Sequence, residues 1–194
     1  MSEAVLGAEV RDEPFPHVTH VAPLSAALCA TALDWMETDA PWTLQVASFY
    51  EQWELHLEAE TAPCAIAGLI SSETIRCLRE LMLAPLTSER LTLTEVTAHK
   101  LLPGQTIRVH NDYLAHGETH RLLLQLNRGW DDAQGGLLML FGSASAQDVR
   151  RILRPVHGSA VAFPITANSF HAVSTIQDGA RYTLVYSFKV EPVV

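Results

Sequence analysis

Two segments in the first ninety residues carry apolar side chains at helical spacing. The first has its apolar positions at Leu24, Leu28, Ala32, Trp35 and Met36. Such a stripe is typical of an amphipathic helix with one buried face. In the second segment, Ser71 or Ser72 can cap a helix that ends before Pro85. Its apolar face would be formed by Ile75, Leu78 and Met82. We therefore expect residues 1–90 to be mostly helical support.

After Leu91 the pattern changes to short runs rich in Val, Leu, Ile and Thr, separated by turn signals such as Pro103-Gly104 and Gly135-Gly136. The predicted strands lie near residues 91–100, 106–110, 120–127, 137–141, 151–156, 158–163, 171–176 and 181–190. Strands at this spacing predict a mainly β protein, a double-stranded β-helix related to jelly rolls and cupins. Helices from the first half would pack outside one sheet.

The last predicted strand separates two kinds of side chain, because strand residues alternate between faces. Large and mostly apolar residues share one face: Tyr182, Leu184, Tyr186 and Phe188. Small or polar residues and one arginine share the other: Arg181, Thr183, Val185 and Ser187. We expect the first face to pack under the helices and the second face to line a pocket.

Composition narrows the class of protein. A chain of 194 residues, 48% hydrophobic and 18% charged, suits a single folded domain over 1–194 with its β core in 91–190. A net charge of −9 argues against a nucleic-acid partner, which would select clustered Lys and Arg. The apolar stretch from Val21 to Leu33 follows acidic residues and is too short to span a bilayer, so we expect no membrane association.

The number and spacing of the cysteines indicate the cellular compartment. Cys29, Cys64 and Cys77 are odd in number and widely spaced, which is typical of reduced thiols in a cytoplasmic protein. The sequence gives no indication of oligomeric state.

Four residues at particular intervals carry the candidate chemistry. His110 and Asp112 form an H-x-D pair; His171 follows 59 residues after Asp112, and Arg181 ten residues after His171. Two imidazoles and a carboxylate can bind one face of an octahedral Fe(II) and leave three positions open. A guanidinium can hold a carboxylate in bidentate fashion. The set predicts an iron site beside an anion site.

From about Leu91 to Val190 the sequence resembles the 2-oxoglutarate/Fe(II)-dependent oxygenase superfamily, most closely its prolyl 4-hydroxylase-like branch. The glycine-led run Gly135-Gly136-Leu-Leu-Met-Leu-Phe141 and the stretch from Arg154 to Pro164 add to the resemblance. It implies that His110, Asp112 and His171 bind Fe(II). It also implies that Arg181 binds the distal carboxylate of the cosubstrate 2-oxoglutarate, with O₂ as oxidant and ascorbate as a candidate reductant. Thr183, on the same face as Arg181, could add a hydroxyl donor.

The resemblance implies hydroxylation of an aliphatic carbon in an amino acid or in a peptide or protein side chain, with succinate and CO₂ as co-products. Because the carboxylate of Asp112 is present, hydroxylation is favoured over halogenation, which needs a small residue there. Desaturation and ring formation remain open, as does the substrate. The alternatives are a cupin-type metal enzyme that does not use 2-oxoglutarate and a non-catalytic metal-binding β-helix module.

Other residues leave further interpretations open. His116 and His120, with Glu118 between them, could form a zinc site, although Gly117 favours a loop. His157 is the alternative distal ligand. Where the resembled family often has a tyrosine before the motif, this chain has His99 and Lys100. The second donor to the cosubstrate is therefore open, with Gln125 and Asn127 as candidates. The loop 128–134, which contains an aromatic residue, is a candidate substrate lid.

Overall fold

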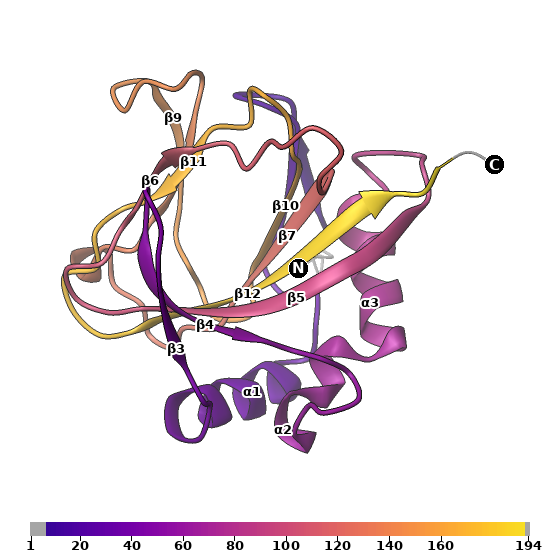
Figure 1. The fold of residues 1–194 in the computed structure, drawn as a ribbon, viewed down its shortest axis with the longest axis vertical. Coiled ribbons are helices and arrows are strands. Elements are labelled where there is room, and N and C mark those ends of the chain that lie inside the picture. Colours follow the sequence, from indigo (N-terminus) through magenta and orange to yellow (C-terminus); the bar gives the residue numbers. More distant parts are fainter. Residues whose placement is uncertain (1–6, 193–194) are drawn as a thin grey trace, which may run out of the picture.

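The computed structural model describes residues 7–192, and it folds as strands with a few short helices (Figure 1). The strands are β1 (Glu9–Arg11), β2 (His17–His20), β3 (Thr43–Val46), β4 (Glu51–His56), β5 (Leu91–Leu101), β6 (Ile107–His110), β7 (His120–Gln125), β8 (Leu138–Phe141), β9 (Val149–Leu153), β10 (Ala160–Pro164), β11 (His171–Val173) and β12 (Arg181–Val190). The helices are α1 (Ala26–Thr38), α2 (Cys64–Ala67) and α3 (Ser72–Leu78), with short turns η1 (Gly68–Ile70), η2 (Arg79–Leu83) and η3 (Asp132–Gln134).

Within residues 7–192 the strands form two antiparallel sheets, one of eight strands and one of four. The large sheet has the order β1-β2-β10-β7-β12-β5-β4-β3, and the small sheet has the order β6-β11-β8-β9. This is the predicted double-stranded β-helix. The eight strands expected after residue 91 are all present, as β5 to β12, with ends that differ by no more than three residues from the prediction.

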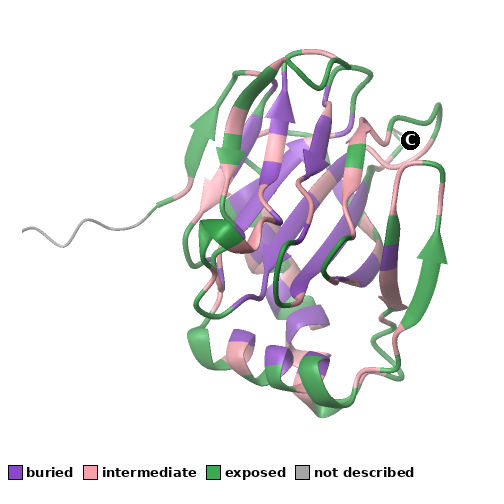
Figure 2. Ribbon diagram, turned by 90° about the vertical axis from the view of Figure 1, so that its left-hand side faces the viewer, coloured by how far each residue is buried: buried purple, intermediate pink, exposed green. Residues whose placement is uncertain are grey.

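Strand β12 divides the interior into two apolar layers, as its alternation predicts. Tyr182, Leu184, Tyr186 and Phe188 belong to a core shared by the large sheet and the helices. Val185, on the opposite face, belongs to a second core between the two sheets. Buried residues therefore concentrate in the central strands, whereas the outer strands are more exposed (Figure 2).

The helices cover the outer face of the large sheet (Figure 1). Ser25 caps α1 by accepting a hydrogen bond from the backbone N of Leu28 at 3.3 Å. Ser71, rather than Ser72, caps α3 in the same way and accepts from the backbone N of Thr74. The buried face of α1 consists of Cys29, Ala32, Leu33 and Met36, so it is rotated slightly from the predicted stripe.

The expectation of mostly helical support before residue 91 missed four strands. β1 and β2 extend one end of the large sheet, and β3 and β4 extend the other. These strands are short, and β1 and β3 are exposed along their length. The alternation of β1 and β3 is therefore weak in the sequence, because few of their side chains need to be apolar.

None of the helices in the described part of the chain is long and apolar enough to cross a lipid bilayer. Cys29, Cys64 and Cys77 are all free thiols.

Candidate active site

His110 and His171 face each other across two paired strands. His110 is the last residue of β6, His171 is the first of β11, and the two residues are register partners in the small sheet. Their ring centroids are 4.2 Å apart. Antiparallel pairing thus brings together two imidazoles that are far apart in the sequence.

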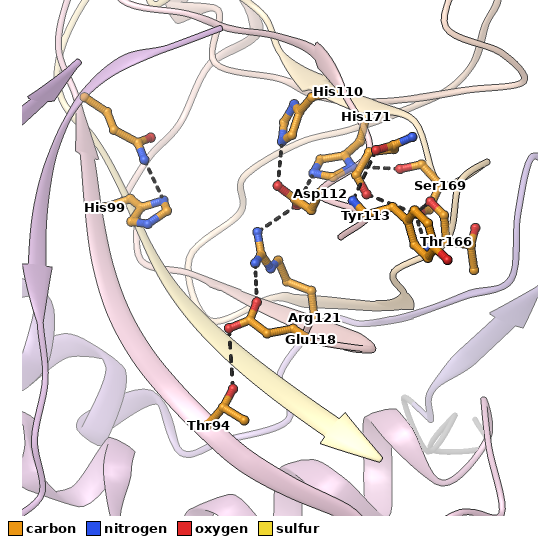
Figure 3. Close-up of polar contacts among 12 residues, drawn as sticks. Thr94, His99, His110, Asp112, Tyr113, Glu118, Arg121, Thr166, Ser169 and His171 are labelled. Atoms are coloured by element: carbon orange, nitrogen blue, oxygen red, sulfur yellow. Dashed lines mark hydrogen bonds and ion pairs between the residues drawn. The ribbon is translucent and has the colours of Figure 1, made fainter. Parts of the chain in front are cut away.

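Asp112 joins the pair from the turn after β6. Its φ of 56° lies in the left-handed region, which Asp tolerates better than most residues. Asn111 fixes the turn: its Nδ2 donates to Ala167 O at 3.0 Å, and its Oδ1 accepts from Tyr113 N at 3.1 Å. Asp112 Oδ1 then lies 3.4 Å from His110 Nε2, and Oδ2 lies 3.3 Å from His171 Nε2 (Figure 3).

Both histidines are oriented for a metal. His110 Nδ1 lies 2.8 Å from Arg108 O, and His171 Nδ1 lies 2.9 Å from Ser169 O. A carbonyl can only accept, so each Nδ1 carries a proton, and Nε2 is the nitrogen that each ring can offer to a metal. Ligand atoms of the three residues lie within 4.8 Å of one another. Two imidazole nitrogens and a carboxylate that converge in this way fit a bound cation such as Fe(II).

Arg121, on β7, supports the carboxylate and was not foreseen from the sequence. Its Nη1 donates to Asp112 Oδ2 at 2.7 Å, and its Nη2 donates to Glu118 Oε2 at 2.6 Å (Figure 3). Burial alone would raise the pKa of Asp112. The contacts with His110 and His171 and the charge of Arg121 outweigh burial and hold that pKa well below its usual range. The carboxylate is therefore ionised and ready to bind a metal.

The three residues line a cavity of about 280 Å³ that is also lined by Arg181 and Thr183. Arg181 is 3% exposed and is held by Gln125, whose Oε1 accepts from Arg181 Nη2 at 3.1 Å and from Thr183 Oγ1 at 3.0 Å. Burial lowers the pKa of Arg181 to about 10, so the side chain remains charged at neutral pH. Among residues 7–192, no carboxylate pairs with it. A buried guanidinium without a counter-charge fits an anionic ligand.

Gly136 leaves the space that Arg181 occupies. Its φ is 64°, and a Cβ added there would lie 2.9 Å from Arg181 Cδ and 2.7 Å from Ile176 Cδ1. Gly136 therefore serves the anion site as well as the turn.

His99 occupies the cavity wall where the resembled family often has a tyrosine. It is the register partner of Thr183, and its Nδ1 lies 3.3 Å from Gln52 Nε2. Burial, together with the charges of Arg121 and Arg181, lowers the pKa of His99 to about 3, so its ring is neutral. Since Gln52 Nε2 can only donate, Nδ1 accepts and the proton is on Nε2.

Several cavity residues before β5 were missed. Phe49 stacks on His110 with centroids 4.5 Å apart, and Tyr50, Gln52 and Glu54 line the same cavity. The polar positions Gln52, Glu54 and His56 alternate with Trp53 and Leu55. This period of two was the available signal for a strand with a polar inner face.

The other sequence candidates lie elsewhere. His116 and His120 are not in the metal-ligand cluster found in the described residues, and neither is His157. His116 is exposed in a turn with a φ of 66°, and His120 Nδ1 lies 3.0 Å from Thr119 Oγ1.

Asn127 has a structural role, because it donates to Pro155 O and Tyr182 O and accepts from Tyr182 N. No residue of the loop 128–134 lines the cavity, and Arg128 instead pairs with Asp34 of α1. The loop is therefore not a lid in this structure.

Comparisons with known proteins agree with this geometry. Residues 96–189 match the sequence model of the 2OG-Fe(II) oxygenase superfamily. No curated protein sequence matches the chain significantly. Among solved structures, a Pseudomonas putida prolyl-4-hydroxylase is similar with a TM-score of 0.69 and 21% identity, over 90% of this chain and 92% of that one.

Two further structures share the fold. A Trichoplax adhaerens prolyl hydroxylase in complex with a hypoxia inducible factor peptide fragment has a TM-score of 0.71 and 13% identity, over 89% of this chain and 83% of that one. A viral collagen prolyl hydroxylase from Paramecium Bursaria Chlorella virus-1, in complex with 2-oxoglutarate, has a TM-score of 0.64 and 12% identity, over 90% and 96%.

The superfamily match spans His110, Asp112, His171 and Arg181, the residues that the fold brings to one cavity. Residues 96–189 therefore match the 2OG-Fe(II) oxygenase superfamily, and the fold and the geometry of the site agree with a 2-oxoglutarate- and Fe(II)-dependent oxygenase.

Proposed function

We propose that the enzyme hydroxylates an aliphatic carbon of an amino-acid residue within a peptide or protein, and that His110, Asp112 and His171 hold its iron. When bound, iron and 2-oxoglutarate supply the oxidising chemistry: O₂ and 2-oxoglutarate become succinate and CO₂, and one oxygen atom enters the substrate C–H bond. The two imidazoles and the carboxylate would occupy one face of the metal. Arg121 would keep Asp112 ionised and fixed in position.

Arg181 is the main support for 2-oxoglutarate as the cosubstrate. It is a buried cation in the same cavity as the histidine–aspartate cluster, and no anion among residues 7–192 satisfies it. It would pair with the distal carboxylate of the cosubstrate, and Thr183 would donate its hydroxyl beside it. This observation favours a 2-oxoglutarate enzyme over a cupin-type enzyme without that cosubstrate.

His99 would supply the second donor to the cosubstrate. Its Nδ1 faces Gln52, and the protonated Nε2 is left to donate. Apolar side chains from both sheets line the same space: Leu123, Leu138, Val173 and Val185. They would exclude water from the reacting centre.

The surface beside the cluster supports a peptide substrate. A hollow outside the cavity includes Phe49, Tyr113, Leu114 and Phe170 together with His110 and Asp112. Tyr113 and Leu114 are 52% and 73% exposed and so present apolar surface to a ligand beside the cluster. The Trichoplax adhaerens neighbour is in complex with a peptide fragment.

The proposal is tested by an anaerobic titration of metal-free protein with Fe(II) and then 2-oxoglutarate. Wild type should develop the visible charge-transfer band of an iron–2-oxoglutarate chelate, and His171→Ala should not. His116→Asn is the matched control, because His116 is an exposed histidine in a left-handed turn that Asn tolerates. It should retain the band.

If folded wild-type protein shows no band, the 2-oxoglutarate assignment is wrong. If the band forms, succinate release with and without a peptide then measures whether turnover depends on substrate, in the presence and absence of ascorbate.

A further inference from the structure

One wall of the cavity is acidic and lies on β4 and β5. β4 and β5 are antiparallel, with Glu54 opposite His99 and His56 opposite Thr97. Because strand residues alternate, Gln52 and Glu54 share the inner face with Glu95, Thr97 and His99. All of these except His56 line the cavity that contains the histidine–aspartate cluster.

The charges in and around this cavity are balanced except on that wall. Arg121 pairs with Asp112 and with Glu118. Under the proposed function, Arg181 is matched by one carboxylate of 2-oxoglutarate. The two charges of Fe(II) then offset Asp112 and the other carboxylate. Glu54 and Glu95 remain.

Neither glutamate has a permanent cationic partner within the described chain. Glu54 Oε1 accepts from the neutral amide Gln52 Nε2 at 2.7 Å, and the hydroxyl of Tyr50, also neutral, hydrogen-bonds to the Glu54 carboxylate. Glu95 Oε1 accepts from Thr97 Oγ1 at 2.6 Å and lies 2.7 Å from Nδ1 of His56, an imidazole that is charged only when protonated. The wall therefore has a surplus of negative charge beside an oxidising centre.

Gln52 gives a second and independent sign of a missing donor. Its side chain is 2% exposed, and its Oε1 has no hydrogen-bond partner among residues 7–192. The orientation of the amide is fixed, because Nε2 must face the carboxylate of Glu54 and the Nδ1 of His99. A buried acceptor beside a part-buried carboxylate fits a group that presents several N–H donors and a positive charge.

A second metal ion does not explain the wall. The described residues contain one cluster of three or more metal-ligating side chains in mutual range, and that cluster is His110, Asp112 and His171. The remaining candidate ligands of the wall are ammonium and guanidinium groups, since they carry three and five N–H donors.

We propose that Gln52, Glu54 and Glu95 form a subsite for the cationic end of a substrate side chain, so that the residue hydroxylated is a lysine or an arginine. This inference rests on the proposed function. The charged nitrogen group would bind at the wall, and the methylene carbons between it and the backbone would lie in the cavity toward the iron. Tyr50, which lines the same cavity, could pack against the aliphatic part of the side chain.

The test compares matched probes with and without a cationic end group. Blocked tripeptides N-acetyl-Gly-X-Gly-amide carry lysine or norleucine at X, and a second pair carries arginine or citrulline. Each is titrated anaerobically into protein with Fe(II) and 2-oxoglutarate, and the perturbation of the visible band gives Kd. Wild type should bind the better cationic probe at least about tenfold more tightly than its neutral partner, the scale of one charge-assisted hydrogen bond.

Substitutions of the two glutamates test whether the acidic wall causes the preference for the cationic probe. Glu54→Gln and Glu95→Gln should each reduce the ratio of the two Kd values by about threefold or more, and the double variant should abolish it. Glu60→Gln removes an exposed glutamate outside the cavity and is the matched control. Substrate-dependent succinate release should follow the same order of probes.

The outcomes are separable. If wild type forms no band, the proposed function fails. If the band forms and the lysine and arginine probes bind no better than norleucine and citrulline, or do not bind, the cationic subsite is wrong. A preference that survives in the double variant also contradicts it.

Discussion

The orientation of each histidine at the site is set two residues earlier in the chain. In both cases Nδ1 faces the carbonyl of the residue at i−2: Arg108 for His110 and Ser169 for His171. In an extended segment, residues i and i−2 lie on the same side, so a short backbone contact selects the tautomer. The sequence motif therefore specifies which nitrogen is free as well as which residues meet.

Arg181→Ala should separate cosubstrate binding from metal binding. Loss of a buried charge-assisted contact of about 1.5–3 kcal/mol should raise the Kd of 2-oxoglutarate about 10- to 100-fold, with Fe(II) still bound. The measurement is a titration of 2-oxoglutarate at saturating Fe(II), followed by the visible band.

Arg154→Ala is the control, because Arg154 is exposed and pairs with Asp132. Unchanged cosubstrate affinity in Arg181→Ala would contradict the assigned role.

Among single residues, the sequence predicted those whose side-chain chemistry and spacing resemble the motif of the superfamily. His110, Asp112, His171, Arg181 and Thr183 were all predicted, and all line one cavity. Arg121, Gln52 and Glu54 were not predicted. Their importance depends on which neighbours the sheet pairing gives them, and a single polar residue in a strand carries no sign of that pairing.

Strand β12 shows how one element serves two purposes. Its apolar face holds the helices, and its other face lines the cavity. Tyr186 extends the first role, because its hydroxyl donates to Leu69 O at 3.0 Å across the helical layer.

Phe188→Ala should therefore lower the stability of the fold. Phe188 is fully buried, and truncation of a buried phenylalanine lowers the free energy of unfolding by about 3–5 kcal/mol. Urea unfolding followed by circular dichroism measures the change.

Ser187→Ala, on the opposite face of the same strand, should change the free energy of unfolding by less than about 1 kcal/mol. Equal effects of the two substitutions would contradict the division of faces.

The strands could be predicted from the sequence where apolar and polar residues alternate clearly and glycine or proline marks the turns. The strands from β5 to β12 meet that condition, since paired glycines and Pro-Gly turns separate β-rich runs. β4 also alternates, from Gln52 to His56, and was overlooked, whereas β1 to β3 are short and the edge strands β1 and β3 are exposed along their length. Their existence follows from the sheet that they extend and not from their own composition.

Over the whole molecule, burial of histidines links folding to pH. His17 is fully buried, His120 is nearly so, and burial lowers the pKa of each from 6.5. Between the lowered native pKa and 6.5 the unfolded chain binds more protons, so stability rises with pH in that range. The contribution of these neutral histidines to stability is fully present above about pH 6.5 and is lost as the pH falls below that value.

Metal-free protein should consequently have a lower urea midpoint at pH 5 than at pH 7.5. Each histidine that stays neutral at pH 5 should contribute about 1–2 kcal/mol to the difference. Unfolding curves at constant ionic strength measure it, and a midpoint that does not change over this range would contradict the prediction.

The position of β4 near the rim of the large sheet has a consequence for how this enzyme can be altered. β4 has only β3 beyond it, and His110, His171 and Arg181 lie on other strands, β6, β11 and β12. Glu54 of β4 contacts Gln52 and none of the residues proposed to hold iron, so it can change without disturbing the frame that holds the oxidising centre. The choice of substrate is thus structurally separable from the reaction, and new specificities would be sought first by varying this rim.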